Sequence, residues 1–243
     1  MERVDKLTAN GYKILQDTDG FCFGMDAVLL SWFAKVSAGE TVLDLCTGTG
    51  VVPLLLAAHT QGAHFTGLEI QERVADMAGR SVALNGVEDR VSIVCGDLKE
   101  AAKHFPKASF DVVTCNPPYM SPQGGLVNPS DGKAISRHEI KCTLADVIEA
   151  AKQMMKSGGR FYMVHRPRRL PEIFALCAEN GLHIRTLRTV QPRIGEPANM
   201  VLIEAIRGGN AQCNIAPTCV IYEGRDASGK DIYTDEIRRY FEE

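Results

Sequence analysis

Asp44-Leu45-Cys46-Thr47-Gly48-Thr49-Gly50 is the stretch of this 243-residue sequence from which the fold can be predicted. It closes an apolar run, Thr41–Cys46, that is typical of a buried strand, and it leads directly into a helical pattern, Val51–His59. Glycines let the backbone turn sharply between two such elements and approach a ligand closely. The stretch therefore predicts the first strand–helix turn of an α/β sheet, with a ligand site at the carboxyl end of the strand.

Strand-like and helix-like segments alternate along the next hundred residues. The expected strands are Thr41–Cys46, His64–Ile70, Val91–Cys95, Phe110–Cys115 and Arg160–His165. The expected helices are Val51–His59, Gln71–Asn85, Thr143–Lys156 and Pro171–Asn180, and Gly158-Gly159 is expected to cap the third of them. Such alternation predicts a parallel sheet with helices on both faces.

The last two expected strands, His183–Val190 and Asn199–Ile206, have no helix between them, so they must pair antiparallel. A mostly parallel sheet that ends in an antiparallel hairpin is typical of class I methyltransferases. We expect a Rossmann-like α/β fold with a seven-stranded mixed sheet. We also expect one domain over residues 1–243, with 1–35 as an N-terminal extension. The segment 120–139 is rich in Pro, Gly, Ser and Asn, which makes it a candidate substrate loop.

Composition narrows the class of protein. The formal net charge of −3 argues against a strongly basic surface, so any contact with nucleic acid must use a local cluster of cations. The eight cysteines form no CxxC pair, and no histidine cluster stands near them at metal-ligand spacing, so no metal is expected. No signal-peptide core or membrane-length apolar run is present. The expectation is a cytoplasmic protein with reduced thiols and no evident obligate protein partner.

Polar side chains close four successive expected strands: Asp44, Glu69, Asp97 and Asn116. The carboxyl ends of parallel strands share one edge of the sheet, so these groups should surround one site. The third glycine of a dinucleotide-binding turn is replaced by Pro53, which favours S-adenosylmethionine over a nicotinamide cofactor. Glu69 would accept hydrogen bonds from ribose and Asp97 from adenine. Each acid could also be only a solvated strand end or a helix cap.

Asn116-Pro117-Pro118-Tyr119 follows the expected strand Phe110–Cys115. Neither proline can donate to a sheet, so the chain must leave the sheet after Asn116. This presents an amide, two carbonyls and an aromatic ring, which suit a planar amino nucleophile: acceptors for its N–H bonds and a ring to stack on its face. A proline-rich turn with a capping asparagine is the structural alternative.

In order and spacing these blocks resemble amino-methyltransferases that act on exocyclic nitrogen. More narrowly, nearly the whole chain is similar to the bacterial tRNA(Val) adenine N6-methyltransferase family, whose substrate adenine lies beside the anticodon. The narrower marks are Asp44 to Pro53, Gly67-Leu68-Glu69-Ile70-Gln71, Asn116-Pro117-Pro118-Tyr119, Asn128-Pro129, Ala134-Ile135-Ser136-Arg137-His138-Glu139 and Tyr233-Thr234. One departure is Cys46, where the family often has glycine.

The resemblance implies S-adenosylmethionine-dependent methylation of an adenine N6 in tRNA. The implied catalytic residues are Asn116, Pro117 and Tyr119. The implied cofactor residues are Phe23, Asp26, Asp44, Cys46, Thr47, Gly48, Gly50, Glu69, Ile70, Asp97, Leu98 and Asn116. Phe23 could instead belong to the core, and Asp26 could be only a helix cap.

Candidate RNA contacts are Arg166, Arg168 and Arg169 after the fifth expected strand, and Lys133, Arg137 and His138 in the long loop. Arg185, Arg188 and Arg193 could extend this cluster or simply face solvent. Three other functions remain open on sequence alone. They are N5-methylation of a protein glutamine, amino-methylation of a base in rRNA or DNA, and RNA binding without catalysis.

Overall fold

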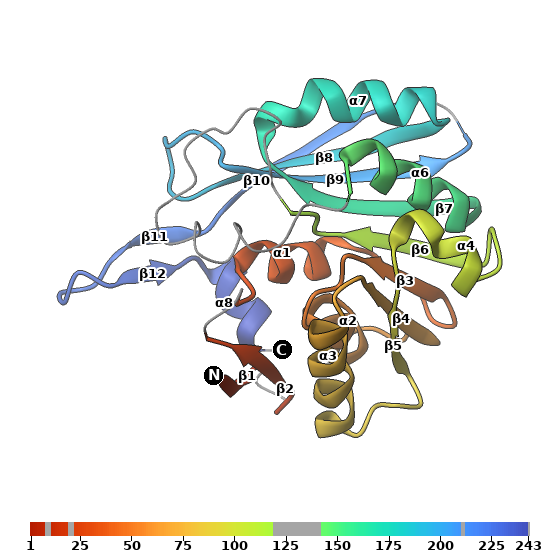
Figure 1. The fold of residues 1–243 in the computed structure, drawn as a ribbon. Helices are drawn as coiled ribbons and strands as arrows, with labels where there is room; N and C mark the ends of the chain where they lie inside the picture. Colours follow the sequence, from red (N-terminus) through yellow and green to blue (C-terminus); the bar gives the residue numbers. More distant parts are fainter. Residues whose placement is uncertain (8–10, 19–21, 119–141, 210–211, 243) are drawn as a thin grey trace.

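An eight-stranded mixed sheet forms the centre of the computed structural model (Figure 1). The structure describes residues 1–7, 11–18, 22–118, 142–209 and 212–242. The strand order is β10-β8-β9-β7-β6-β3-β4-β5, and of these eight strands β9 alone runs antiparallel to its neighbours. The strands are β3 (Thr41–Leu45), β4 (His64–Glu69), β5 (Val91–Cys95), β6 (Phe110–Cys115), β7 (Met155–His165), β8 (Leu182–Gln191), β9 (Met200–Arg207) and β10 (Asn214–Val220).

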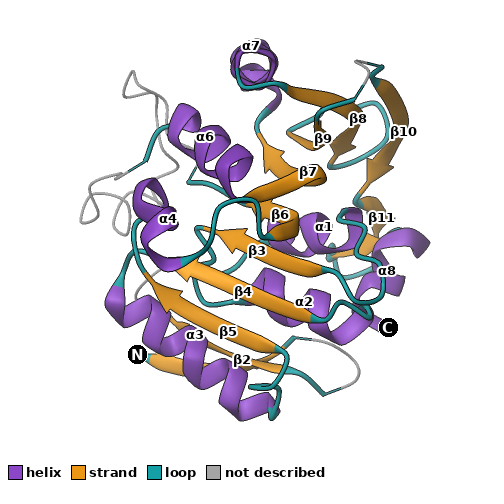
Figure 2. Cartoon of the chain, turned by 90° about the vertical axis from the view of Figure 1, so that its right-hand side faces the viewer, coloured by secondary structure: helices purple, strands orange, loops and turns teal. Residues whose placement is uncertain are grey.

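Helices cover both faces of the sheet (Figure 2). On one face lie α1 (Met25–Phe33), α2 (Val51–His59) and α3 (Glu72–Asn85); on the other lie α4 (Ala101–His104), α6 (Leu144–Met154) and α7 (Leu170–Glu179). The central strands β3 and β6 are apolar on both sides, as buried parallel strands must be. Val42 and Val112 pack into the first core, whereas the adjacent Leu43 and Val113 pack into the second. The continuous apolar runs of the sequence thus become a sheet buried on both faces.

The expected strand–helix order is confirmed, and two strands, Val91–Cys95 and Phe110–Cys115, have the predicted bounds. The interpretation of Gly158-Gly159 as a helix cap is wrong. Helix α6 ends at Met154, and β7 begins at the next residue, because Met155 is fully buried and pairs with Phe110. The two glycines lie inside β7, where the register shifts. A Cβ on Gly159 would meet the Lys156 carbonyl oxygen at 2.9 Å, so this is a close backbone approach within a bulge.

The sheet has one strand more than the seven expected. Strand β10 adds parallel to β8, and after it come β11 (Tyr222–Arg225), β12 (Asp231–Tyr233) and helix α8 (Asp235–Glu242). Helix α8 is fixed to the first core by aromatic stacking. The Trp32 ring of α1 lies between His59, at 4.2 Å between centroids, and Tyr240, at 4.9 Å, nearly parallel to both.

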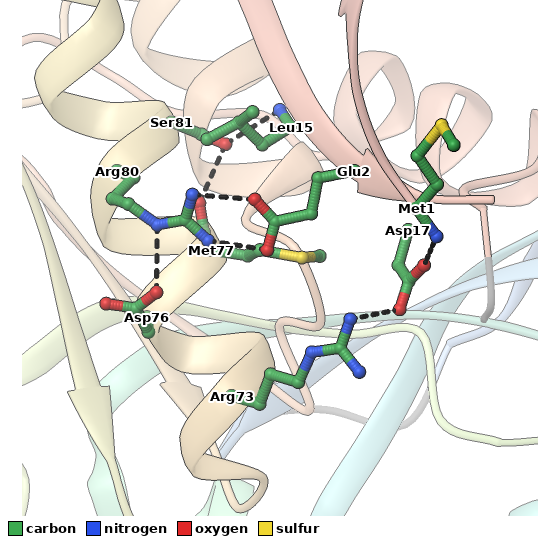
Figure 3. A network of polar contacts seen from close by, with 9 residues as sticks. All are labelled: Met1, Glu2, Leu15, Asp17, Arg73, Asp76, Met77, Arg80 and Ser81. Atoms are coloured by element: carbon green, nitrogen blue, oxygen red, sulfur yellow. Dashed lines mark hydrogen bonds and ion pairs between the residues drawn. The ribbon is translucent and has the colours of Figure 1, made fainter. Parts of the chain in front are cut away.

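An N-terminal hairpin, β1 (Glu2–Lys6) and β2 (Lys13–Asp17), packs against α3 (Figure 3). Arg80 of α3 binds both carboxylate oxygens of Glu2 at 2.8 and 2.9 Å, and Arg73 binds Asp17 at 2.6 Å. The backbone N–H of Leu15 donates to the Ser81 hydroxyl at 2.9 Å. Part of the expected extension 1–35 is therefore a folded hairpin, and its contacts occupy one side of α3. Short helical turns η1 (Leu98–Glu100) and η2 (Pro167–Arg169) follow β5 and β7.

Candidate active site

Asp44 is the penultimate residue of β3, beside β6, and its carboxylate links the two strands. The Thr114 hydroxyl donates to Asp44 Oδ1 at 2.6 Å, and the Thr47 hydroxyl donates to Oδ2 at 2.7 Å. Only 2% of Asp44 is exposed. The pKa of this carboxyl is raised to about 7: burial raises it most, the two hydroxyl donors lower it, and the negative charge of Glu69 adds to the rise.

The turn between β3 and α2 adopts three left-handed conformations. They occur at Cys46 (φ 57°), Gly48 (φ 56°) and Gly50 (φ 85°), and Gly50 is the N-cap of α2. Glycine enters this region without strain, but a cysteine does not. The geometry explains why glycine is expected at position 46: the backbone conformation there favours a residue without a side chain.

Glu69 ends β4 and holds this turn in place. Its Oε2 accepts the Gly48 N–H at 3.0 Å, and its Oε1 accepts the Gln71 N–H at 3.0 Å. The side chain is 5% exposed. The neighbouring strand approaches the turn closely, since a Cβ on Gly67 would meet Thr47 Cγ2 at 2.7 Å. The acid and the glycine turn predicted from the sequence are thus brought together.

Asp97 follows β5 and caps the turn η1. Its Oδ1 accepts the Lys99 N–H at 3.0 Å, and Oδ2 lies 3.5 Å from Lys99 Nζ. The capping role that the sequence left open is therefore present. The next residue, Leu98, is buried in the core against α4 and α6.

Two candidates lie near the start of α1. The Phe23 N–H donates to Gln16 Oε1 of the N-terminal hairpin at 2.8 Å. Asp26 is not the N-cap of α1, because that position is Gly24; its Oδ1 instead accepts the N–H of Ala27 at 3.0 Å.

Asn116 and Pro117 leave the sheet at the carboxyl end of β6, next to the end of β3. Asp44 lies opposite Thr114 in the register, so Asn116 is two residues beyond the Asp44 contact. Pro117 is buried and Pro118 is exposed. The third implied catalytic residue, Tyr119, lies outside the described residues.

His165 ends β7, the neighbour of β6 on the side away from β3, and is 3% exposed. Burial and the nearby Arg169 lower its pKa to about 4, so the ring is neutral at pH 7. Its Nδ1 accepts the N–H of Arg166 at 2.8 Å, which leaves the proton of the neutral ring on Nε2.

The cations expected to bind RNA differ in their surroundings. Arg168 is exposed in η2, whereas Arg169 forms two bonds to Glu172 at 2.6 and 2.7 Å. Arg166 donates to the Asn199 carbonyl at 3.1 Å. Lys133, Arg137 and His138, like the rest of the expected loop 120–139, fall outside the described residues.

The suggested extension of this cluster along β8 is not favoured. Arg188 pairs with Glu236 at 2.7 Å, and Arg193 pairs with Asp231 and Glu196. Arg185 is exposed. Within the described ranges no group of His, Cys, Asp or Glu is arranged to hold a metal ion, and each helix there is too short or too polar to cross a bilayer.

Comparison with known proteins decides the family. The model of the methyltransferase small domain family matches residues 24–177, which span every strand from β3 to β7. The chain belongs to the methyltransferase small domain family. Two curated relatives are the tRNA1(Val) (adenine(37)-N6)-methyltransferases of Aeromonas salmonicida and Bacteroides thetaiotaomicron. The first is 27% identical over 86% of this chain and 87% of its own, and the second is 28% identical over 79% of each.

A solved structure shows the same fold. The crystal structure of a predicted O-methyltransferase from Agrobacterium tumefaciens superimposes with a TM-score of 0.71 at 24% identity, covering 89% of this chain and 95% of that one. The class I methyltransferase fold expected from the sequence is confirmed.

Sequence reasoning missed two polar groups at the site of this methyltransferase small domain, Thr114 and His165. Thr114 carried a signal: a hydroxyl within the apolar run Phe110–Cys115 needs a buried partner, and the acid of the adjacent strand supplies it. His165 was expected only as the last residue of the strand Arg160–His165, although the apolar run before it favours a buried, neutral ring.

Proposed function

We propose that this methyltransferase transfers a methyl group from S-adenosylmethionine to the N6 amino group of an adenine in tRNA, namely position 37 of tRNA1(Val). The observation that carries the proposal is the adjacency of β3 and β6. The glycine turn with its two carboxylates and the Asn116-Pro117 pair leave neighbouring strands at the same sheet edge. The names of the curated relatives support the substrate.

The residues around the turn fit S-adenosylmethionine better than a phosphate-bearing cofactor. The turn between Cys46 and Gly50 contains no lysine or arginine, and the side chains that flank it are the carboxylates of Asp44 and Glu69. A buried carboxylate favours a cationic amino group, and a second can accept from ribose hydroxyls. When bound, the cofactor supplies a methyl group on a positively charged sulfur, where an amine can displace it.

Asn116 and Pro117 would act on the adenine. The amino nitrogen is a poor nucleophile, because its lone pair is delocalised into the ring. Acceptance of its two N–H bonds by Asn116 Oδ1 and the Pro117 carbonyl favours the pyramidal nitrogen of the transition state. The product nitrogen sheds its proton readily, so no strong base is needed. We expect most of the rate enhancement to come from positioning of the two reactants.

The tRNA would approach over η2, where Arg168 is exposed and Arg166 lies beside it. Both follow β7, so they stand at the same edge as Asn116. Contacts to phosphates position the nucleic acid without reading its sequence. Recognition of the one nucleotide then depends on the base that reaches Asn116, taken out of the anticodon-loop stack.

The test is methyl transfer by the purified chain to separate tRNA, rRNA, DNA and protein fractions from a strain that lacks the gene, followed by mass analysis of the nucleosides and amino acids. N6-methyladenosine in tRNA1(Val) is expected. N5-methylglutamine in protein, with no label in RNA, would instead select the glutamine alternative. Label confined to rRNA or DNA would reject tRNA as the substrate.

A further inference from the structure

Strand β5 forms one edge of the central sheet, and within the described residues no strand pairs with its outer side. Its backbone alternation is fixed by two bonds to β4: the Arg90 carbonyl accepts from Phe65, and the Gly96 N–H donates to Glu69. Even-numbered residues therefore face β4, and Val91, Ile93 and Cys95 direct their backbone polar groups to the open edge. Because the turn uses the Val91 N–H, the donors at this edge are Ile93 and Cys95.

This edge lacks the features that discourage strand pairing. The sequence of β5, Val-Ser-Ile-Val-Cys, has no charge, no proline and no bulge. The opposite edge of the sheet does have them, because β10 carries Pro217 and an irregular register between Ala216 and Cys219. Exposed edges without such protection are templates for another strand.

A groove of about 420 Å³ runs between this edge and α3. Its floor is apolar, from Ala75, Val82, Val91 and Ile93, and the exposed Glu72, Asp76 and Glu88 line it. Asp76 is paired with Arg80 at 2.8 Å, whereas Glu72 and Glu88 form no ion pair within the described residues (Figure 3 shows Asp76 and Arg80). The groove therefore carries a net negative charge.

Gly79 stands in the middle of α3, beside this groove. Glycine weakens a helix because it loses the most conformational freedom on folding, so a position in mid-helix needs a compensating role. The described part of the chain supplies none by packing, since a Cβ built on Gly79 would meet no atom within 4 Å. The absent side chain leaves room for a ligand of the groove.

We propose that this groove binds an extended, basic segment of a partner protein, which adds to β5 as a further strand. The backbone of Ile93 and Cys95 would pair with the segment, its apolar side chains would lie over Ala75 and Val82, and its cations would meet Glu72 and Glu88. A second copy of the chain is a poorer occupant of the groove, because in an edge-to-edge pair the carboxylates of Glu72 and Glu88 in the two copies would repel each other. Phosphates of RNA are disfavoured for the same reason.

The groove is separate from the residue expected to hold the substrate amino group, although Cys95 of β5 lies opposite Glu69 in the register of β4 and β5. Strand β6 and β5 are separated in the sheet by β3 and β4, so a segment on β5 leaves Asn116 open. The proposal does not depend on the methylated substrate, and its test reads no methylation.

The probe is a labelled seven-residue peptide with lysine at its first and last positions, valine at its third and fifth and threonine between them, so that the lysines and valines share one face of the added strand; its binding is titrated by fluorescence anisotropy. Its controls are the glutamate–valine peptide and a lysine–valine peptide with a central proline. We expect the lysine–valine peptide to bind at least tenfold tighter than either control. Hydrogen exchange should slow at the Ile93 and Cys95 amides. Absence of binding at millimolar peptide, or equal binding of the acidic peptide, would overturn the proposal.

Gly79→Leu fills the groove from a helix position beside it, and Gly79→Ala is its matched control. Leucine should weaken peptide binding at least tenfold, whereas alanine should leave it within about twofold. Glu72→Gln with Glu88→Gln should weaken it without change in the peptide-free exchange pattern. Two results would reject a basic partner: equal binding by the leucine and alanine variants, or protection of β5 by concentration-dependent dimerisation alone.

Discussion

The Thr114 hydroxyl donates to the Asp44 carboxylate at 2.6 Å, and this bond joins the strand that precedes the glycine turn to the strand that precedes Asn116. The two residues lie opposite each other in the parallel register of β3 and β6. The bond is buried, so it fixes the relative position of the two strand ends from which the turn and the asparagine emerge.

Asp44 should make stability depend on pH. Its pKa is about 7 in the folded chain, against 3.8 for an unperturbed aspartate side chain. The folded state therefore holds the proton more tightly than the unfolded state, and the free energy of unfolding falls as pH rises from about 4 to about 7. With about 1.4 kcal/mol for each pKa unit, the loss is on the order of 4 kcal/mol. Urea unfolding at pH 5 and pH 8 measures the part of this loss that falls between those values, about 2.6 kcal/mol. In Asp44→Asn the free energies of unfolding at the two pH values should differ less than in the wild type. An unchanged difference would contradict the assignment of this pH dependence to Asp44.

Asn116→Ala should reduce methyl transfer by about 10²-fold, because the lost acceptor acts mainly in the transition state. Affinity for S-adenosylhomocysteine should stay within about twofold. Steady-state kinetics and calorimetry on the same preparation separate the two quantities. Asn116→Asp keeps acceptor oxygens and should retain more activity than the alanine variant. Near wild-type turnover in Asn116→Ala would mean that the amino group is held by other residues.

Glu69→Ala should weaken S-adenosylhomocysteine binding by removing a carboxylate that accepts the Gly48 N–H and that we propose accepts from the cofactor ribose. A hydrogen bond to a charged group contributes about 1.5–3 kcal/mol, so a loss of at least tenfold in affinity is expected by calorimetry. Glu69→Gln preserves the size of the side chain and one acceptor oxygen. Its affinity for S-adenosylhomocysteine should therefore lie between those of the wild type and Glu69→Ala. If NADH bound tightly and S-adenosylhomocysteine did not, the cofactor assignment would be wrong.

Glycine should give a more stable chain than alanine at position 46, and alanine a more stable chain than glycine at position 79. At position 46 the backbone is left-handed, so Cys46→Gly should be more stable than Cys46→Ala by about 1 kcal/mol. At position 79 the backbone is helical and a Cβ meets no atom, so Gly79→Ala should stabilise the chain by about 1 kcal/mol. Denaturant midpoints of the three variants and the wild type test both orders. The same order at both sites would refute the conformational argument.

Arg168→Ala should weaken tRNA binding and reduce its salt dependence by about one unit of slope, since one fewer counterion is released. Arg169→Ala should have a smaller effect, because Glu172 already binds that guanidinium through two bonds. Filter binding from low to high salt gives the slopes. Equal slopes for wild type and Arg168→Ala would remove this residue from the RNA interface.

The bounds of a strand were predicted correctly where particular residues prevent the strand from continuing. Gly96-Asp97 ends β5 and Asn116-Pro117 ends β6, and both strands have the expected bounds. Gly158-Gly159 misled because paired glycines serve both a helix end and a bulge, and only the burial of Met155 in the sheet decides between them. Strand β10 was missed because its residues are mostly exposed and interrupted by Pro217, as an edge strand allows.

The candidate site was predictable in its strand-end positions but not in its bonds. Asp44, Glu69 and Asn116 meet at one edge because parallel strands end there. The choice of Thr114 as the partner of Asp44 depends on the register of β3 and β6, which no local pattern specifies. Arg169 pairs with Glu172 because η2 continues directly into α7. This continuation brings the two residues, which are three apart in sequence, onto the same helix surface.

The ring stack of Trp32 between His59 and Tyr240 gives this chain an internal optical probe. The sequence contains a single tryptophan, so the tryptophan emission, excited selectively over that of the tyrosines, has one source. That source lies at the seam between α1, α2 and the last helix of the chain. Undocking of α8 would expose one face of the indole while the central sheet stays intact. Fluorescence and circular dichroism recorded during the same denaturation would then distinguish the release of helix α8 from the unfolding of the whole domain.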